Sequence, residues 1–479
     1  MGGLLWVLLM IQTAQMQWSS DIWQHVAAIR ELMVNPLAPG HPFVAEQLPH
    51  FSFSAYHWLA AYIGGWAGLT PLATAQVLAA INGALILLTF PAFVRAFLGT
   101  RPAALWALAL VLVAWGPGAW RYSGFLHLNA IGFALPYPSA FATWLTFATV
   151  GWFAANRSAP GRLWAACVGL AIAGFLVANA HIITFVLLVV SLGALWWKQP
   201  TARVAVLAIS SVAGAILGTL LWPLFDLFDL MLHASGAIDA GNTLMYVDPL
   251  PRLGPALLGV VPLVQRLRAS RLDPLALAFT GMVVIYLVGW LYQRPTLGRV
   301  IFFVGLFLHL ALAGWLSDLW SQESRARQWI RVAIVSALVL ATLNMLPGLV
   351  RMVPFTFLPE ALQADPRLRV VDPELFSLRG VVAHGEVVLT SPSLKTEVTA
   401  VAGKVVCPGA VPYLEDWMAR ETDCLQFFAE PLANKATLGK YDVVWILIAP
   451  SDISFTNIEA LSQMGESRRI GEYLLIEVF

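Results

Sequence analysis

Charged residues are scarce in this chain of 479 residues. They make up 11% of it, against about 25% in ordinary soluble domains, and hydrophobic residues make up 59%. No water-soluble fold has enough interior to bury that much apolar surface. The composition therefore excludes a cytosolic enzyme, a secreted disulfide scaffold and a disordered protein, and it predicts an integral membrane protein.

Two further shortages narrow the class of protein. The formal net charge is only +1, so the chain has no basic field for the phosphates of a nucleic acid, and we expect no nucleic-acid partner. The three cysteines, Cys167, Cys407 and Cys424, are too few for a disulfide framework or a thiolate metal cluster.

Apolar runs long enough to cross roughly 30 Å of hydrocarbon recur as far as residue 349. They predict a polytopic α-helical membrane domain over residues 1–353 with about eleven transmembrane helices. The predicted spans are 3–18, 72–98, 102–118, 139–155, 163–179, 182–197, 204–222, 254–265, 273–292, 299–317 and 329–349.

Lysine and arginine occur in alternate short loops, and this pattern sets the predicted orientation, because cytoplasmic loops carry an excess of both residues. The cations concerned are Arg95, Arg101, Arg157, Arg162, Lys198, Arg203, Arg266, Arg268, Arg271, Arg325, Arg327 and Arg331. Loops 19–71 and 223–253 then lie on the outer side. Counting the apolar stretch 53–68 as a span would break this alternation, so we predict a juxtamembrane helix there.

The composition changes after Pro354. Apolar runs shorten to strand length at 387–390, 404–407, 441–449 and 472–478, and helix-like stretches lie near 412–429 and 453–464. This pattern predicts a small extracytoplasmic α/β domain over residues 354–479. Cys407 and Cys424 both fall in it, either as a disulfide or as two buried free thiols.

Acidic residues are rare in the first half of the chain. The first 225 residues contain only Asp21, Glu31 and Glu46, all in the first predicted outer loop. Asp21 directly follows the first span, and an ionisable group at the membrane edge is a functional candidate. It also precedes the helix-like run IWQHVAAIREL, where an aspartate is a favoured N-cap. The two roles are compatible.

The other two acids allow simpler interpretations. Glu31 is adjacent to Arg30, which predicts a solvated ion pair. Glu46 lies near His41 and His50 and is either a metal ligand or an exposed loop acid.

Histidines gather on the predicted outer side. They are His25, His41, His50, His57, His127, His181, His233 and His384. Such a group suits phosphate contact, proton transfer or a divalent metal, but the spacing matches no metal motif, so we assign no metal ligands and leave a divalent metal open. His181 lies at a tight turn between two short spans, where a purely structural role is equally open.

Four arginines on the predicted outer side run against the positive-inside bias. They are Arg121, Arg252, Arg294 and Arg299. Each needs an anionic partner, and the phosphate of a lipid-linked donor matches a guanidinium well. The alternative is contact with membrane headgroups.

The segment SSDIWQHVAAIREL after the first span, the stretch from HFSFSAYHW to the basic turn at Arg95, and the loop 223–253 together resemble the GT-C superfamily of polyprenyl-phosphate-sugar-dependent membrane glycosyltransferases. The tail, with VVLT, KYDVVWILI and EYLLIEVF, resembles the soluble C-terminal domain of many bacterial members. The paired acidic motif of some members is absent, because Ile22 follows Asp21.

The resemblance implies a bacterial inner-membrane enzyme that moves a sugar, with inversion, from a polyprenyl-phosphate donor to a glycan, lipid or protein acceptor on the outer face. Asp21 would be the general base. The residues implied for the donor phosphate are Arg252, Arg294, Arg299 and His181. Those implied to line the acceptor side are His25, Glu46, His50, His57, Arg121 and Tyr137.

A transporter or flippase of lipid-linked saccharides is the alternative function. It also needs outer cations and a groove for lipid. It is expected to show inverted repeats and polar groups within its spans, and only Asn82 and His309 come near the latter.

Overall fold

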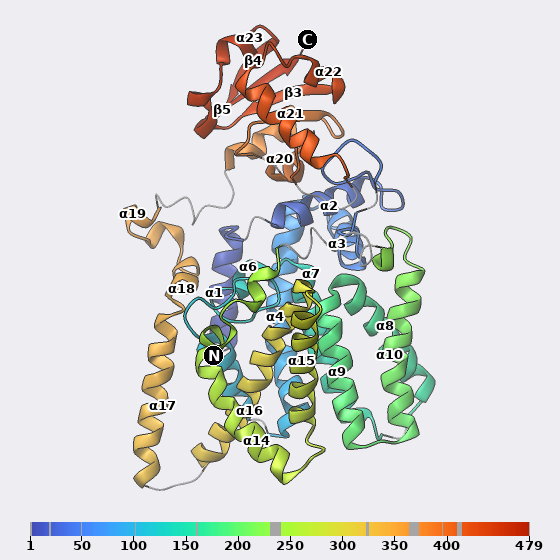
Figure 1. Cartoon of the computed structure of the whole chain (residues 1–479), viewed down its shortest axis with the longest axis vertical. Coiled ribbons are helices and arrows are strands. Elements are labelled where there is room, and N and C mark those ends of the chain that lie inside the picture. Colours follow the sequence, from blue (N-terminus) through green and yellow to red (C-terminus); the bar gives the residue numbers. More distant parts are fainter. Residues whose placement is uncertain are drawn as a thin grey trace. The chain divides into compact units, whose positions relative to one another are not determined.

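The computed structural model of the chain describes residues 2–18, 21–48, 50–100, 102–159, 161–229, 241–321, 325–363, 373–394, 396–409 and 414–478. These residues are mostly helical and include a five-stranded sheet (Figure 1). Packing divides the chain into two compact units. The helical unit comprises Met1–Trp18, Val77–Trp222 and Ile238–Ala364, and the mixed unit comprises Ser19–Gln76, Pro223–Ala237 and Asp365–Phe479.

The predicted segments 1–353 and 354–479 divide the chain by composition, whereas the two units interleave along the sequence. The segment division stays a prediction. Arg101, His233 and residues 230–240 of the predicted long outer loop lie outside the described residues.

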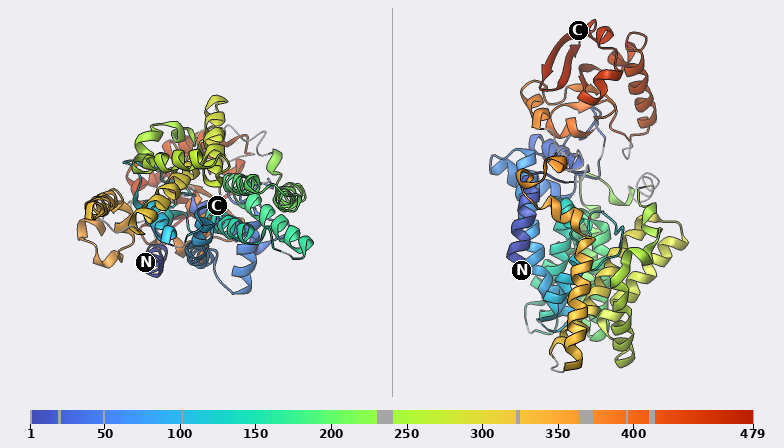
Figure 2. Two further views of the ribbon diagram at one scale, coloured as in Figure 1. Left: turned by 90° about the horizontal axis from the view of Figure 1, so that it is seen from below. Right: turned by 90° about the vertical axis from the view of Figure 1, so that its left-hand side faces the viewer.

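The helical unit contains most of the helices, and its long helices run side by side (Figures 1 and 2). The elements in this part of the chain are α1 (Gly2–Ala14), α4 (Pro71–Leu98), α5 (Pro102–Val113), α6 (Ile131–Ala134), α7 (Pro138–Asn156), α8 (Leu163–Ala180), α9 (Ile182–Lys198), α10 (Ala202–Leu220), η1 (Thr243–Tyr246), α13 (Pro249–Leu253), η2 (Gly254–Gly259), α14 (Val260–Ala269), α15 (Pro274–Leu291), η3 (Pro295–Val300), α16 (Ile301–Ser321), α17 (Arg325–Leu343), α18 (Leu346–Arg351), η4 (Phe355–Phe357) and α19 (Glu360–Gln363).

Five stretches of the described residues are helical, long and apolar enough to cross a membrane: α4, α8, α10, α15 and the run Pro295–Ser321. Shorter apolar helices occur at Gly2–Ala14, Pro102–Val113, Ile182–Lys198 and Arg331–Leu343. These helices support an integral membrane protein. The count of about eleven spans and the orientation stay predictions.

The predicted span 254–265 is not one helix in the structure. Its first half is the 3-10 helix η2, and its second half belongs to α14, which ends on Arg266 and Arg268. Gly254, the first residue of this span, has a φ of 49°, a backbone conformation that favours glycine, and it separates η2 from the preceding α13. A hydropathy pattern reports apolar residues and does not distinguish a 3-10 helix from an α-helix.

Local sequence explains several helix starts in this unit. The Asp273 side chain accepts a hydrogen bond from the Ala276 amide and caps α15, with Pro274 in the first turn. The Thr201 hydroxyl caps α10 in the same way. Inside the unit, α5 packs against α16 and α8 packs against α10, and aromatic side chains such as Phe93, Phe147 and Phe307 fill the core.

The mixed unit combines the first predicted outer loop with the C-terminal region. Its elements are α2 (Ile22–Val34), α3 (Ala55–Trp66), η6 (Pro373–Gly380), β1 (Val387–Thr390), α20 (Thr396–Val401), β2 (Lys404–Val405), α21 (Trp417–Ala429), α22 (Ala436–Lys440), β3 (Val443–Ile448), η7 (Pro450–Phe455), α23 (Ile458–Ser462), β4 (Gly465–Ile470) and β5 (Tyr473–Val478). The strand order is β2-β1-β3-β5-β4. The first three strands are parallel, and β5 is antiparallel to both β3 and β4.

The central strands of the sheet are buried on both faces. Along β3, Trp445 and Leu447 belong to one hydrophobic cluster, whereas Ile446 and Ile448 belong to another, as the two-residue period of a strand requires. Ala27, Phe43 and Val44 of the first predicted outer loop join the first cluster. The Val405 amide also donates to the Phe43 carbonyl at 2.7 Å. The loop is therefore part of the core of this unit.

Candidate functional site

Asp21 immediately precedes α2 in the mixed unit. It occupies the N-cap position, but its side chain makes no capping hydrogen bond with the helix, and the residue is exposed. The structure thus gives Asp21 no capping role that would explain an aspartate here. The helix itself is held by its buried face, which includes Trp23, Val26 and Ile29.

One turn further along α2 lies His25, the start of a chain of hydrogen-bonded side chains. His25 Nδ1 lies 2.9 Å from His57 Nε2, and the two rings stack with their centroids 5.0 Å apart. His57 Nδ1 in turn lies 2.8 Å from the Ser54 hydroxyl, just before α3. Burial lowers the pKa of His25 to about 4 and the pKa of His57 well below its ordinary value. Both rings are therefore neutral near pH 7.

His41 and His50 form a second, fully buried pair in the same unit, with ring centroids 5.0 Å apart. His41 Nδ1 accepts hydrogen bonds from the amides of Phe43 and Val44, and His50 Nδ1 accepts one from the Ser52 amide. These bonds place the proton of each neutral ring on Nε2. Burial lowers the pKa of His41 to about 3 and that of His50 well below its ordinary value.

Glu31 corrects a prediction, because it is not a solvated ion pair. Its side chain is only 2% exposed, and it accepts from Lys404 at 2.7 Å and from Arg30 at 3.0 Å. His384 lies 3.1 Å from the same carboxylate. Lys404 also donates to the His41 carbonyl at 2.6 Å. The sequence around Glu31 shows only the adjacent Arg30. It does not predict that Lys404, distant in the chain, pairs with this carboxylate in a buried position.

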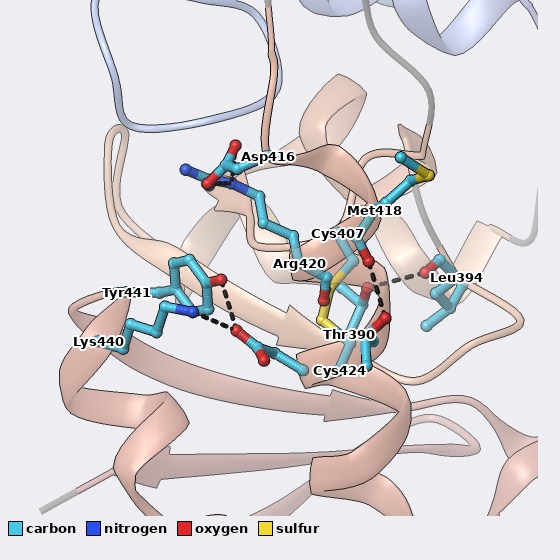
Figure 3. Close-up of a disulfide and its surroundings, with 11 residues drawn as sticks. Thr390, Leu394, Cys407, Asp416, Met418, Arg420, Cys424, Lys440 and Tyr441 are labelled. Atoms are coloured by element: carbon cyan, nitrogen blue, oxygen red, sulfur yellow. Dashed lines mark hydrogen bonds and ion pairs between the residues drawn. A yellow bond between two sulfur atoms is a disulfide. The ribbon is translucent and has the colours of Figure 1, made fainter.

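Glu46 pairs with Arg420 of α21 rather than with the nearby histidines. Figure 3 shows the Arg420 guanidinium beside the Asp416 carboxylate, with Nε 2.9 Å from Oδ2. Burial lowers the pKa of Arg420, but its bonds to the two carboxylates outweigh this effect and raise the pKa. Glu46 therefore links the first loop to α21. It is not placed as a metal ligand.

Cys407 and Cys424, for which the sequence allowed either a disulfide or two free thiols, form a disulfide. It joins Cys407, just after β2, to Cys424 in α21, with the two Cα atoms 6.6 Å apart (Figure 3). The bond closes a short loop that carries Asp416 and Arg420. Cys167 is a free, half-buried thiol.

In the helical unit, three segments distant in sequence converge into what we name the arginine loops: residues 115–125, 241–254 and 293–300. The Trp120 indole donates to the Leu244 carbonyl at 3.0 Å, and the Tyr122 hydroxyl donates to the Gly241 carbonyl at 3.0 Å. Asn242 donates to the Thr296 hydroxyl at 3.3 Å. Arg121, Arg252, Arg294 and Arg299 therefore belong to one group of loops.

Two cations of the arginine loops are held by neighbouring residues of the same loops. Arg299 donates to the carbonyl of Ser123 at 2.9 Å and to its hydroxyl at 2.7 Å. The Arg252 guanidinium lies over the Trp120 ring, 5.3 Å from its centroid. Among the described residues, Arg121, Arg252 and Arg294 form no ion pair with an acid. Arg121 and Arg294 are exposed.

A glycine at position 116 permits this convergence. The Gly116 amide donates to the Arg252 carbonyl at 2.9 Å, and a Cβ at Gly116 would collide with the carbonyl oxygen of Pro251. Only glycine allows the two backbones to approach so closely. This contact fixes the segment that carries Arg252.

His181 and Tyr137 lie elsewhere in the helical unit. His181 separates α8 from α9, and its Nδ1 accepts from the Thr184 amide at 3.3 Å, which caps α9. This geometry accounts for the structural role that the sequence left open. α9 also packs against η3, which carries Arg299. Tyr137 is buried and precedes α7.

The described residues do not fit a metal ion. No group of three or more His, Cys, Asp or Glu side chains that could hold one occurs among them. His41 and His50 use Nδ1 for backbone amides, and Glu46 is paired with Arg420. We therefore derive no step through a metal.

Comparison with known proteins finds solved structures that are similar to this chain. The archaeal oligosaccharyltransferase AglB from Archaeoglobus fulgidus, in complex with an inhibitory peptide and a dolichol-phosphate, matches with a TM-score of 0.50 and 13% sequence identity. The match covers 90% of this chain and 66% of that protein. The fold of this chain is similar to the fold of that oligosaccharyltransferase. No protein-family model and no curated protein matches the chain, and at this identity the likeness shows the fold alone.

The structure thus brings together two sets of predicted residues, His25 with His57 and the four arginines. Sequence reasoning missed Ser54, Trp120 and Ser123, which position them. Ser54 lies three residues before His57, a spacing that favours a local hydrogen bond. The contacts of Trp120 and Ser123 join segments more than 100 residues apart, and no local pattern encodes them.

Proposed function

We propose that this chain is an inverting glycosyltransferase that moves a sugar from a polyprenyl-phosphate donor to an acceptor on the outer face of a membrane. The observation that carries the proposal is the convergence of the arginine loops, which bring four cations into one group of loops, in a fold similar to that of an oligosaccharyltransferase. The solved relative contains dolichol-phosphate, a polyprenyl phosphate, which supports this donor class. The acceptor is a glycan, a lipid or a protein.

In the proposed reaction, the acceptor hydroxyl attacks the anomeric carbon of the donor sugar. A new carbon–oxygen bond forms while the bond from that carbon to the phosphate oxygen breaks, and the configuration inverts. The hydroxyl proton passes to the Asp21 carboxylate, which acts as general base. The bonding electron pair stays on the departing phosphate.

The departing phosphate gains negative charge, so cationic groups in fixed positions lower the barrier. We assign this role to Arg252, Arg294 and Arg299, whose guanidinium groups match phosphate oxygens. His181 is a further proposed phosphate contact. We propose that Arg121, Tyr137, His25, His50, His57 and Glu46 line the acceptor side, where Glu46 acts through its bond with Arg420.

The decisive experiment is Asp21→Asn, which keeps the shape of the side chain and removes its basicity. We expect kcat for sugar transfer to fall by about 10²- to 10⁴-fold, the usual contribution of a general base. Binding of the polyprenyl-phosphate donor should stay unchanged, because Asp21 is not assigned to the phosphate. Steady-state transfer and donor binding measured on the purified full chain separate the two effects.

The matched control is Asp318→Asn. Asp318 is another exposed aspartate, near the end of α16, and it has no role in the proposal. Near-normal turnover in Asp21→Asn, or an equal loss in Asp318→Asn, would overturn the assignment of Asp21. If no polyprenyl-phosphate binds wild-type protein, the donor class is wrong as well.

A further inference from the structure

A cavity of about 480 Å³ lies in the helical unit at the ends of four helices. Four of its lining residues are cations: Arg95, Arg157, Lys198 and Arg266. None of its lining residues is acidic. We name it the basic cavity. Its volume falls in the usual range for small-ligand sites, about 300–1,000 Å³.

The basic cavity is separate from the arginine loops. α15 starts directly after Asp273, the partner of Arg266, and ends at Leu291, just before Arg294. Because an α-helix rises 1.5 Å per residue, its 18 residues separate the two groups by about 27 Å along the helix axis. The charge pattern predicts that the end with the basic cavity is cytoplasmic.

Two of the four cations have a structural role. Arg157 donates to the Leu195 carbonyl at 3.0 Å, near the end of α9. Arg266 donates to the Phe97 carbonyl at 3.2 Å, near the end of α4, and pairs with Asp273 at 2.8 Å. Both arginines therefore tie neighbouring helix ends together and fix the walls of the cavity.

The other two cations, Arg95 and Lys198, are exposed at the last turns of α4 and α9. Among the described residues, Arg95 and Lys198 form no ion pair with an acid. The positive-inside bias explains why cations occur in these loops, but not why cations from four helices line one cavity. The carbonyl ends of the helices supply only partial negative charge, so the lining favours an anion.

We propose that the basic cavity is a binding site for a phosphate-bearing anion, the headgroup of an anionic lipid or a soluble phosphate. Basic pockets between transmembrane helices on the cytoplasmic side suit anionic headgroups. α7 lines the cavity through Gly151, Ala154 and Ala155. Its neighbouring face, with Ala148 and Trp152, lines an apolar cavity of about 280 Å³ against α8, a surface that suits an acyl chain.

The test compares two double variants of the full chain in neutral detergent, where no bilayer charge contributes. Arg95→Gln with Lys198→Gln removes the two exposed lining cations. Arg268→Gln with Arg271→Gln removes two exposed cations near the end of α14 that do not line the cavity. Native mass spectrometry measures binding of phosphatidylglycerol and phosphatidylcholine, and the melting temperature follows a titration with inorganic phosphate.

We expect wild-type protein to prefer phosphatidylglycerol, and the lining variant to bind it about 30-fold more weakly, about five-fold for each cation removed. The control variant should resemble wild type, and Lys198→Arg should retain binding. If inorganic phosphate raises the melting temperature and phosphatidylglycerol shows no preference, the ligand is the soluble phosphate. Equal losses in the two double variants, or no response of wild type to either ligand, would overturn the proposal. None of these readouts depends on sugar transfer.

Discussion

The two units hold their charges in different ways. In the mixed unit, charged groups form ion pairs with one another. The buried Glu31 accepts from Arg30 and Lys404, and Arg420 pairs with both Asp416 and Glu46. In the helical unit, Arg266 pairs with Asp273. Other cations of this unit contact carbonyls, hydroxyls and aromatic rings, as Arg157, Arg299 and Arg252 do.

Charged groups in the mixed unit therefore stabilise the fold, whereas cations in the helical unit can still bind an anion. A buried carboxylate that is fully paired stabilises one arrangement of the chain, and the loss of one partner is costly. A cation held by a carbonyl or a ring keeps its full charge and can still attract an anion. We therefore expect substitutions of charged residues to lower stability in the mixed unit and ligand binding in the helical unit.

The largest expected effect is that of Glu31→Gln. It would leave Lys404 and Arg30 buried without a carboxylate, which costs about 3–5 kcal/mol. Burial already lowers the pKa of Lys404 to about 8, so this lysine depends on Glu31 to stay charged. Hydrogen exchange should rise in peptides that cover α2 and β2, where the Val405 amide donates to Phe43.

Glu46→Gln is the matched control for Glu31→Gln. The Glu46 side chain is 42% exposed, and its partner Arg420 keeps Asp416, so the loss should stay below about 1 kcal/mol. Adding Lys404→Met to Glu31→Gln should restore part of the stability, because the unpaired cation is removed. Equal losses in the two single variants would show that burial of Glu31 does not govern the stability of this unit.

Much of the mixed unit could be predicted from its sequence, because its strands are short apolar runs. The predicted strands at 387–390, 441–449 and 472–478 correspond to β1, β3 and β5. β4 was missed because its sequence, GESRRI, is polar, and its residues from Glu466 to Arg469 are exposed at the sheet edge. An edge strand is held by its backbone pairing with β5, which a hydrophobic pattern does not report.

The candidate site could be predicted only in part. Asp21 could be predicted because acids are scarce in the first half of the chain, and Arg252 and Arg299 because they run against the positive-inside rule. Both arguments use only the positions of charged residues along the chain. Which residues meet depends on long-range contacts such as Arg299 with Ser123. The burial of Glu31 also depends on a long-range contact, because its partner Lys404 lies in β2, 373 residues further along the chain.

The second prediction concerns the arginine loops and rests on the proposed function. Arg299→Ala removes a cation that would bond to the donor phosphate, and a hydrogen bond to a charged group is worth about 1.5–3 kcal/mol. We expect binding of dolichyl phosphate to the full chain to weaken about 10- to 150-fold. The melting temperature of the variant measures any loss of stability separately from the loss of donor binding, because Arg299 also donates to Ser123.

Two controls sharpen this prediction. Ser123→Ala removes a hydrogen bond of Arg299 without removing the cation, so donor binding should fall much less. Arg95→Gln removes a cation of the basic cavity, at the other end of α15, and should leave donor binding unchanged. A loss as large in Arg95→Gln as in Arg299→Ala would mean that overall charge, rather than the arginine loops, attracts the donor.

The smallest expected effect for a single residue is a pH dependence of the stability of the mixed unit. Burial lowers the pKa of His25 to about 4 and of His41 to about 3, and holds those of His50 and His57 well below their ordinary value. Between about pH 4 and the unfolded value of about 6.5, the unfolded chain binds more protons than the folded one. The free energy of unfolding therefore falls as the pH falls through this window.

At pH 6 the loss should be on the order of 1 kcal/mol for each buried histidine, and it should reverse on return to pH 7. Hydrogen exchange by peptide, corrected for the intrinsic effect of pH, should show the loss in α2 and α3 before it shows in α15, which contains no histidine. The double variant His25→Gln with His57→Gln removes two of the titrating rings, so its stability should depend less on pH. An unchanged dependence in that variant would show that these buried histidines do not set the acid sensitivity of the mixed unit.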